Sequence, residues 1–215
     1  MSTANIDKIL IENTDIWGFE HAMRGMRNPM NSWDKNDTVM DKGGFVFVGD
    51  NDLKLATNLC KSGPEHRKYL RMIHVSADLT LPRYIWSELD TYHFNTKNSC
   101  STIHRLLNNK NPITEDLFVY NNEDKDLYNK IFDTLENMRL AYINPKSSQS
   151  YKDLLLVRAK RLLPEGFLQK RTFDTNYEEL RNIYHQRKNH RLKEEWGIIC
   201  KWISELPYAN ELLLS

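Results

Sequence analysis

The chain has no long apolar run and almost no excess charge of either sign. Of its 215 residues, 30 are lysine or arginine and 29 are aspartate or glutamate, so the formal net charge is +1. A nearly neutral chain does not coat nucleic acid or an anionic membrane by bulk charge, and any basic function must be local. No apolar stretch approaches the length of a membrane span. The first ten residues lack a basic segment followed by an apolar one, so we expect no signal peptide.

Cysteine is scarce as well. Cys60, Cys100 and Cys200 are odd in number and far apart, which suits neither a metal site nor a disulfide framework. We expect three reduced, buried thiols and a cytoplasmic location, because the cytosol keeps thiols reduced. The HExxH, Walker and GxGxxG motifs are also missing, which argues against a self-contained metal enzyme and against a nucleoside triphosphatase.

What is present is a mostly helical pattern with one clear strand. From Arg71 to Leu81 apolar and polar residues alternate, as in a strand with one buried face. Pro82 suits the first turn of a helix that continues to Tyr92. Residues 167–173 are expected to pair in the same sheet. The remaining apolar periodicity predicts helices over 17–27, 50–61, 123–142, 148–163, 176–190 and 192–206.

These elements predict an α+β fold, mostly helical with a small antiparallel sheet. The most loop-like stretch runs from Arg27 to Gly44, with Gly43 and Gly44 as turn residues. No break is long enough to be a domain linker. We therefore expect a single domain over 1–215 with a loop-rich N-terminal segment of about 49 residues.

Two basic segments, His185–Arg191 and Arg158–Pro164, are candidate sites. Cations near a helix C-terminus are often only a solvated end that faces the negative pole of the helix dipole. A nucleic-acid patch is a second interpretation, although aromatic residues do not alternate with the cations. A third is an arginine fork that anchors a phosphate or carboxylate.

The polar run Asn98–Thr102 enters a predicted helix near Ser101. Serine there is a plain N-cap, or it belongs to an anion site at the helix N-terminus. Nothing in the sequence gives Cys100 a histidine base, so a thiol nucleophile is not favoured. His66 and His74 are interpreted as structural histidines.

The stretch Ala159–Arg187 resembles the flavin-dependent thymidylate synthases (ThyX). That family has an A-R-x-x-L-P motif, an Asn twelve residues after the Pro and an Arg eleven residues later, and Pro164, Asn176 and Arg187 keep both spacings. Trp196 with its preceding glutamates is similar to the family's Gln-Trp-Glu. Residues 52–66 resemble the family's helix and Thr-Pro-x-Glu-His turn. The likeness covers roughly residues 50–205.

The chain departs from the family signature, which is Arg-His-Arg, seven residues, then Ser-x-Arg. Here Thr91, Tyr92 and His93 stand at the Arg-His-Arg positions, and Ile103 stands where the last arginine belongs. Asn98 and Ser101 match the family. In ThyX the signature arginines hold the flavin and the nucleotide, so their replacement bears directly on the expected chemistry.

The resemblance implies a role for each matching residue. Arg187, Lys160, Ser101 and Asn98 would bind the pyrimidine nucleotide dUMP, with Arg187 on its phosphate or base. Asn176, Asn182, Ser62 and His93 would contact FAD. Asn176 and Arg187 are eleven residues apart, which on one helix is about 16 Å, so they would hold opposite ends of a stacked nucleotide and flavin, or ligands shared between subunits.

Three hypotheses follow. The first is a flavin-dependent thymidylate synthase-like enzyme that methylates dUMP, with methylenetetrahydrofolate as carbon donor and FAD and NADPH for reduction; the family's homotetramer implies a homo-oligomer. The second is a nucleotide-binding protein on the same fold without flavin chemistry, which the missing arginines favour. The third is a nucleic-acid or protein interaction module that uses the basic face over 187–191.

Overall fold

The computed structural model describes residues 4–42, 46–108 and 110–215, so Gly43 and Gly44 of the expected turn lie outside the described residues. The contacts group the chain into two compact units. Unit 1 comprises residues 1–10, 79–91 and 98–172, and unit 2 comprises residues 11–78, 92–97 and 173–215. This grouping does not test the expectation of a single domain, which stays a prediction.

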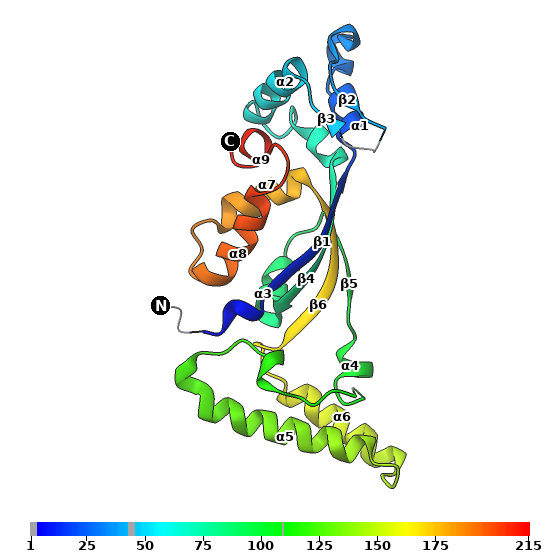
Figure 1. Cartoon of the computed structure of the whole chain (residues 1–215), viewed down its shortest axis with the longest axis vertical. Coiled ribbons are helices and arrows are strands. Elements are labelled where there is room, and N and C mark those ends of the chain that lie inside the picture. Colours follow the sequence, from blue (N-terminus) through cyan, green and yellow to red (C-terminus); the bar gives the residue numbers. More distant parts are fainter. Residues whose placement is uncertain (1–3, 43–45, 109) are drawn as a thin grey trace. The chain divides into compact units, whose positions relative to one another are not determined.

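One four-stranded sheet and a small two-stranded sheet carry the strands. The larger sheet has the order β1-β4-β6-β5, with β1 at Leu10–Trp17, β4 at His74–Pro82, β6 at Leu168–Asn176 and β5 at Thr96–Ser99. In the smaller sheet β2 (Val39–Met40) pairs antiparallel with β3 (Val46–Phe47). The predicted fold class, α+β with a small antiparallel sheet, is confirmed (Figure 1).

The alternating strand is where the sequence pattern placed it. In β4 the side chains of Val75, Ala77, Leu79 and Leu81 are buried and those between them are partly exposed. The strand begins later than Arg71, because Lys68–Met72 forms a 3-10 helix. The second predicted strand, β6, lies next to β4; it begins one residue later than expected and ends three residues later.

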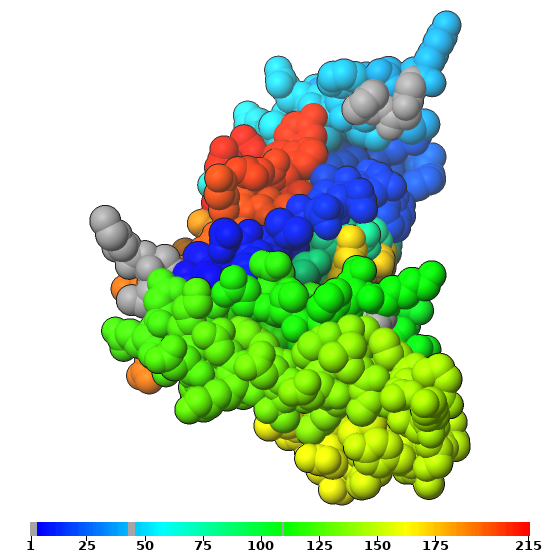
Figure 2. Space-filling view, turned by 60° about the horizontal axis from the view of Figure 1, so that its bottom comes forward, coloured from blue at the N-terminus to red at the C-terminus, as the bar shows by residue number. Residues whose placement is uncertain are grey.

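In unit 1, a helical hairpin packs on an apolar core. Its helices are α5 (Lys125–Ile143) and α6 (Gln149–Leu162), and Ser148 caps α6 by accepting a hydrogen bond from the backbone N–H of Tyr151. Phe118, Leu135 and Leu155 are fully or nearly fully buried in this core. Figure 2 draws this hairpin in green to yellow-green. Leu154 and Val157 of α6 are exposed. The other helices of unit 1 are α3 (Arg83–Leu89) and the single turn α4 (Thr102–Arg105).

Unit 2 contains five helices among its described residues. They are α1 (Phe19–Gly25), α2 (Asp50–Lys61), α7 (Tyr177–Arg187), α8 (Lys193–Ser204) and α9 (Ala209–Leu212). Short 3-10 helices occur in both units, at Ile6–Lys8, Asn28–Met30, Trp33–Lys35, Lys68–Met72, Glu115–Leu117 and Asn122–Asp124.

The first predicted helix was wrong at its start. Trp17 is the last residue of β1, and α1 begins only at Phe19, because Gly18 between them has a left-handed φ of 94°. A Cβ at Gly18 would lie 2.0 Å from the carbonyl oxygen of Met72, so only glycine permits this close approach. Strand β1 itself was missed, because residues 10–17 show only a weak alternation.

Other boundaries also needed correction. Pro82 ends β4 and caps α3 instead of lying in its first turn, and α3 stops at Leu89 before Tyr92. Helix α7 stops at Arg187 and not near His190. Strand β5 and helix α9 were not predicted, because both are short and the strand is polar.

A buried ion pair organises the segment expected to be loop-like. Nε of Arg27 donates to Oδ1 of Asp52 at 2.6 Å, and both side chains are almost fully buried. Oδ2 of the same carboxylate accepts from the backbone N–H and the hydroxyl of Thr38, at 2.9 and 2.6 Å. Asp37 in turn accepts from the first N–H groups of α2, at Asn51 and Asp52. The loop is therefore fixed to α2 by charge-assisted hydrogen bonds.

The three cysteines are free, and Cys60 and Cys200 are buried as expected. Cys100 is exposed, which corrects the expectation of three buried thiols. Across the described residues, no helix has the length and apolar character needed to cross a membrane.

Candidate functional site: a cavity beside Ser101 and a clamped arginine

A cavity of about 470 Å³ lies in unit 1, beside the polar run that the sequence singled out. Ser101 and Thr102 line one side, and Leu106, Ile113 and Phe167 supply an apolar wall. A volume of this size is in the range of pockets that hold small molecules, and an apolar wall with a few polar groups is their usual lining.

The polar side of the cavity is held by backbone and side-chain hydrogen bonds. The N–H of Cys100 donates to the carbonyl of Lys170 at 3.0 Å, and Nε2 of Gln169 donates to the carbonyl of Cys100 at 2.7 Å. The hydroxyl of Ser101 accepts from the N–H of His104 at 3.3 Å, which confirms it as an N-cap. The first two bonds fix the Cys100 backbone, next to Ser101, against β6.

Lys160 supports the same corner from α6. Its ammonium group donates to the hydroxyl of Thr102, which lines the cavity. Burial, and then the positive charge of Arg83, lower the pKa of Lys160 below its ordinary value. The structure thus brings Lys160 and Ser101, two residues predicted to bind the nucleotide, to adjacent positions.

Basic side chains outnumber acidic ones around the cavity. Lys8, Arg105 and Lys170 line it together with Asp7 and Asp116. Lys8 is paired with Asp116 at 3.1 Å. In the part of the chain that the structure describes, the side chain of Arg105 has no hydrogen-bond or ion-pair partner. The cavity therefore has a positive side suited to an anionic group.

In unit 2, Arg187 is half buried at the end of α7. Its Nε donates to the hydroxyl of Tyr92 at 2.9 Å, and its guanidinium lies 5.6 Å from the Tyr92 ring and 4.8 Å from the Trp196 ring. The Tyr92 hydroxyl donates to Gln186, which donates to Asn182. Within the basic segment 185–191, the guanidinium of Arg187 is therefore held in a fixed plane and is not a solvated charge.

Asn176 lies at the other end of the same helix. Its side-chain oxygen accepts from the N–H of Glu179 at 3.1 Å, so Asn176 is the N-cap of α7. The sequence-based placement of Asn176 and Arg187 at opposite ends of one helix is confirmed.

This architecture is similar to that of solved thymidylate synthases. A structure of flavin-dependent thymidylate synthase ThyX from Helicobacter pylori, complexed with FAD and dUMP, superposes with a TM-score of 0.69 at 17% identity, covering 94% of this chain and 97% of that one. A second ThyX structure from Helicobacter pylori with FAD and dUMP gives a TM-score of 0.69 at 18% identity, covering 95% and 97%. This chain has the ThyX fold. No protein-family model matches the sequence, and no curated protein matches it.

On the ThyX fold, the other predicted residues are more exposed. Asn98 lies in β5, in unit 1, and does not line the cavity. Ser62 and His93 are exposed in unit 2, and the Ser62 hydroxyl donates to the carbonyl of Asn58 at 2.8 Å. Asn182 is also exposed and accepts from Gln186 at 2.8 Å.

The predicted residues therefore fall into two groups. Asn98, Ser101 and Lys160 belong to unit 1, and Arg187, Asn176, Asn182, Ser62 and His93 belong to unit 2. Sequence reasoning missed Arg105 and Lys170, which line the cavity. Arg105 had a usable signal: the ThyX-like signature ends on Ile103, and the next arginine lies two residues further along the chain. Lys170 had none, because nothing in the sequence distinguishes it from the other lysines of the chain.

Proposed function

We propose that the chain binds a pyrimidine deoxynucleotide, with dUMP as the first candidate, and that the unit 1 cavity receives its phosphate. The observation that carries this proposal is the position of Arg105 and Lys170 on a cavity that also contains Ser101. Arginine and lysine are the usual partners of phosphate oxygens. The apolar wall, with Phe167, suits a planar base. The ThyX fold adds support, because the two solved relatives hold dUMP.

Calorimetric titration with dUMP and with deoxyuridine tests this proposal. The two ligands share the base and the sugar and differ only in the phosphate. We expect dUMP to bind with saturation, and deoxyuridine to bind at least about tenfold more weakly, since a charge-assisted contact contributes about 1.5–3 kcal/mol. Absence of dUMP binding, or equal affinity for the two ligands, contradicts the proposal.

Flavin-dependent methylation of dUMP is the second candidate, favoured by the FAD in the two solved relatives. When bound, the flavin would supply the redox chemistry of the reaction. The residues that the resemblance assigns to FAD do not reproduce the family's arginine-rich site. The side-chain oxygens of Asn176 and Asn182 accept hydrogen bonds from Glu179 and Gln186 of α7. The Ser62 hydroxyl donates to the carbonyl of Asn58 in α2. His93 is the one residue of this set with a basic side chain.

The diphosphate of FAD carries charge that the family's signature arginines would neutralise, and Thr91 and Tyr92 cannot do this. Nucleotide binding therefore has the stronger support of the two candidates. The absorbance of bound flavin after incubation with FAD separates the two candidates. Retained yellow colour, together with release of the dUMP C5 proton in the presence of methylenetetrahydrofolate, would restore the methylating enzyme. A homo-oligomeric, cytoplasmic protein remains part of the same proposal.

A further inference from the structure

The unit 1 cavity carries a carboxylate that the binding of a phosphate does not explain. Asp7 lines the cavity together with Ser101, Arg105 and Lys170. The side chain of Asp7 is exposed, and among the described residues its carboxylate has no hydrogen-bond or ion-pair partner. An ionised carboxylate repels a phosphate and accepts hydrogen bonds from ligand groups that carry an N–H or an O–H.

The backbone around Asp7 is held on both sides. The side-chain oxygen of Asn5, two residues earlier, accepts from the N–H of Tyr120 at 2.8 Å. The ammonium group of Lys8, the next residue, donates to the carbonyl of Glu115 at 3.0 Å. Asp7 is therefore presented to the cavity by a preformed segment, which lowers the ordering cost of binding.

These contacts place Asp7 next to the apolar wall of the cavity. The chain over 113–117 contributes Ile113 and Leu117 to that wall, and Lys8 pairs with Asp116 of the same stretch at 3.1 Å. Because this pair neutralises Lys8, its charge does not offset that of Asp7. The cavity thus offers cations for a phosphate and, beside its apolar wall, an acceptor for a hydrogen-bond donor.

We propose that Asp7 recognises the base of the nucleotide by accepting a hydrogen bond from the N3–H of uracil. The inference rests on the proposed binding of dUMP in the unit 1 cavity, with the base on the apolar wall and the phosphate on Arg105 or Lys170. N3–H is the only N–H group of the uracil base in dUMP. A carboxylate can only accept, so it selects a base that has a donor at this position.

Calorimetric titration of the full chain with three ligands of equal charge tests this assignment. N3-methyl-dUMP lacks the N–H, and the 2′,3′-dideoxy analogue of dUMP lacks the sugar hydroxyl, which is the other donor that a carboxylate could bind. We expect N3-methyl-dUMP to bind at least about tenfold more weakly than dUMP, because a charge-assisted hydrogen bond is lost. The dideoxy analogue should bind with nearly the affinity of dUMP.

Variants show whether Asp7 causes this preference. In Asp7→Ala the affinities for dUMP and N3-methyl-dUMP should become about equal. The variant is expected to fold, because Asp7 is exposed and unpaired among the described residues. Asp126→Ala removes an exposed acid of α5 outside the cavity and should keep the full preference.

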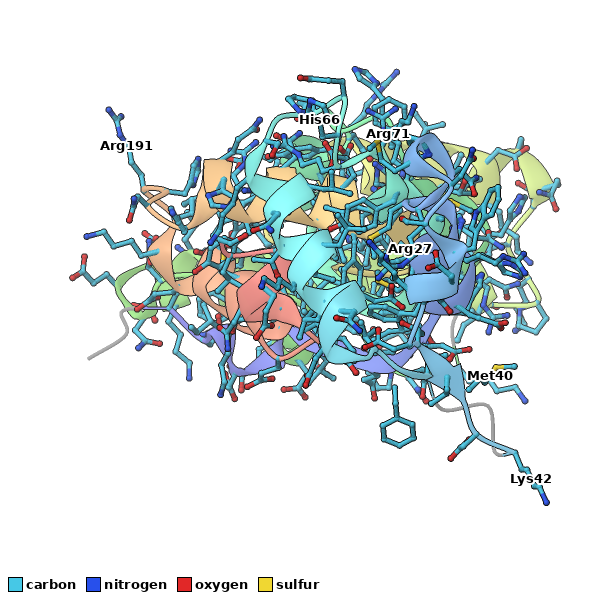
Figure 3. All side chains as sticks on the ribbon, turned by 90° about the horizontal axis from the view of Figure 1, so that it is seen from above. Arg27, Met40, Lys42, His66, Arg71 and Arg191 are labelled. Atoms are coloured by element: carbon cyan, nitrogen blue, oxygen red, sulfur yellow. The ribbon has the colours of Figure 1, made fainter. Side chains whose placement is uncertain are left out.

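A double variant controls for net charge. Arg191 is an exposed cation whose side chain points into solvent (Figure 3). Asp7→Ala combined with Arg191→Ala therefore keeps the formal net charge of +1. Its two affinities should be as similar as those of Asp7→Ala alone.

The outcomes separate this inference from the function on which it rests. Absence of dUMP binding removes both. Binding of dUMP with equal affinity for N3-methyl-dUMP overturns only the role of Asp7. That role is also overturned if the dideoxy analogue binds as weakly as N3-methyl-dUMP, or if Asp7→Ala retains the preference for dUMP.

Discussion

The Nε of Arg187 donates to the hydroxyl of Tyr92 at 2.9 Å, and the two residues lie 95 positions apart in the chain. Tyr92 stands where the ThyX signature has its histidine, so a residue that departs from the signature has a defined task here. It holds the orientation of the arginine that resembles the family's nucleotide-binding arginine. A guanidinium with a fixed plane is better suited to bidentate anion contacts than a mobile one.

In the homo-oligomer proposed above, a site shared between subunits, as the resemblance implies, would bring Arg187 of one copy to the nucleotide held by another. Arg187→Ala should then weaken dUMP binding by about 1.5–3 kcal/mol, because a charge-assisted contact is lost. Tyr92→Phe keeps the ring and removes one hydrogen bond, so its effect should be smaller, about 0.5–1.5 kcal/mol. Calorimetry on both variants, with exposed Arg191→Ala as the matched control, checks this order. An unchanged dissociation constant for Arg187→Ala would mean that this arginine serves only the fold.

Arg105→Ala should also weaken dUMP binding, by about 1.5–3 kcal/mol, and should leave the free energy of unfolding almost unchanged. The reason is that Arg105 is exposed, lines the cavity and has no ion-pair partner among the described residues. Arg161→Ala, on the exposed end of α6, is the control. Equal effects of the two substitutions on dUMP affinity would show that binding depends only on the net charge of the chain.

Asp52→Ala should destabilise the chain by about 3–5 kcal/mol, because it leaves the buried Arg27 guanidinium without its carboxylate. Urea denaturation provides the measurement. Asp50→Ala, in the exposed first turn of the same helix, should cost no more than about 1 kcal/mol. Similar midpoints for the two variants would contradict the role given to the buried pair.

His185 should make stability depend on pH. Burial, and then the positive charges of Arg181 and Lys188, lower the pKa of His185 below its ordinary value of 6.5, and its Nε2 is buried without a described partner. Below pH 6.5 the unfolded chain therefore binds a proton that the folded chain resists, and the free energy of unfolding falls as pH drops. In urea titrations from pH 7 to pH 5, His185→Gln should show a smaller loss of stability than the unaltered chain. An identical pH dependence would remove His185 as the cause.

Local patterns account for much of the fold. The alternation over β4 and the apolar periodicity of α5, α6 and α8 predicted these elements to within a few residues, because each buries one face on a core. Strand β1 could not be found in this way: it carries Glu12, Asn13, Thr14 and Asp15, and only its pairing with β4 makes it a strand. Long-range pairing of this kind leaves little trace in a local window.

The candidate site was partly predictable for a similar reason. Ser101 and Lys160 stand at positions of the ThyX motifs. In the structure, Lys160 donates a hydrogen bond to the hydroxyl of Thr102, the residue after Ser101. Tyr92 and Trp196 had positions in the motif but no predicted task, because cation–π contact depends on tertiary packing.

A crystal structure of the chain with dUMP tests the central claim most directly. We predict that the phosphate lies within about 2.7–3.2 Å of side-chain nitrogen atoms of Arg105 or Lys170, beside Ser101. A nucleotide bound with its phosphate away from this cavity, or no ordered nucleotide at saturating dUMP, would contradict the account.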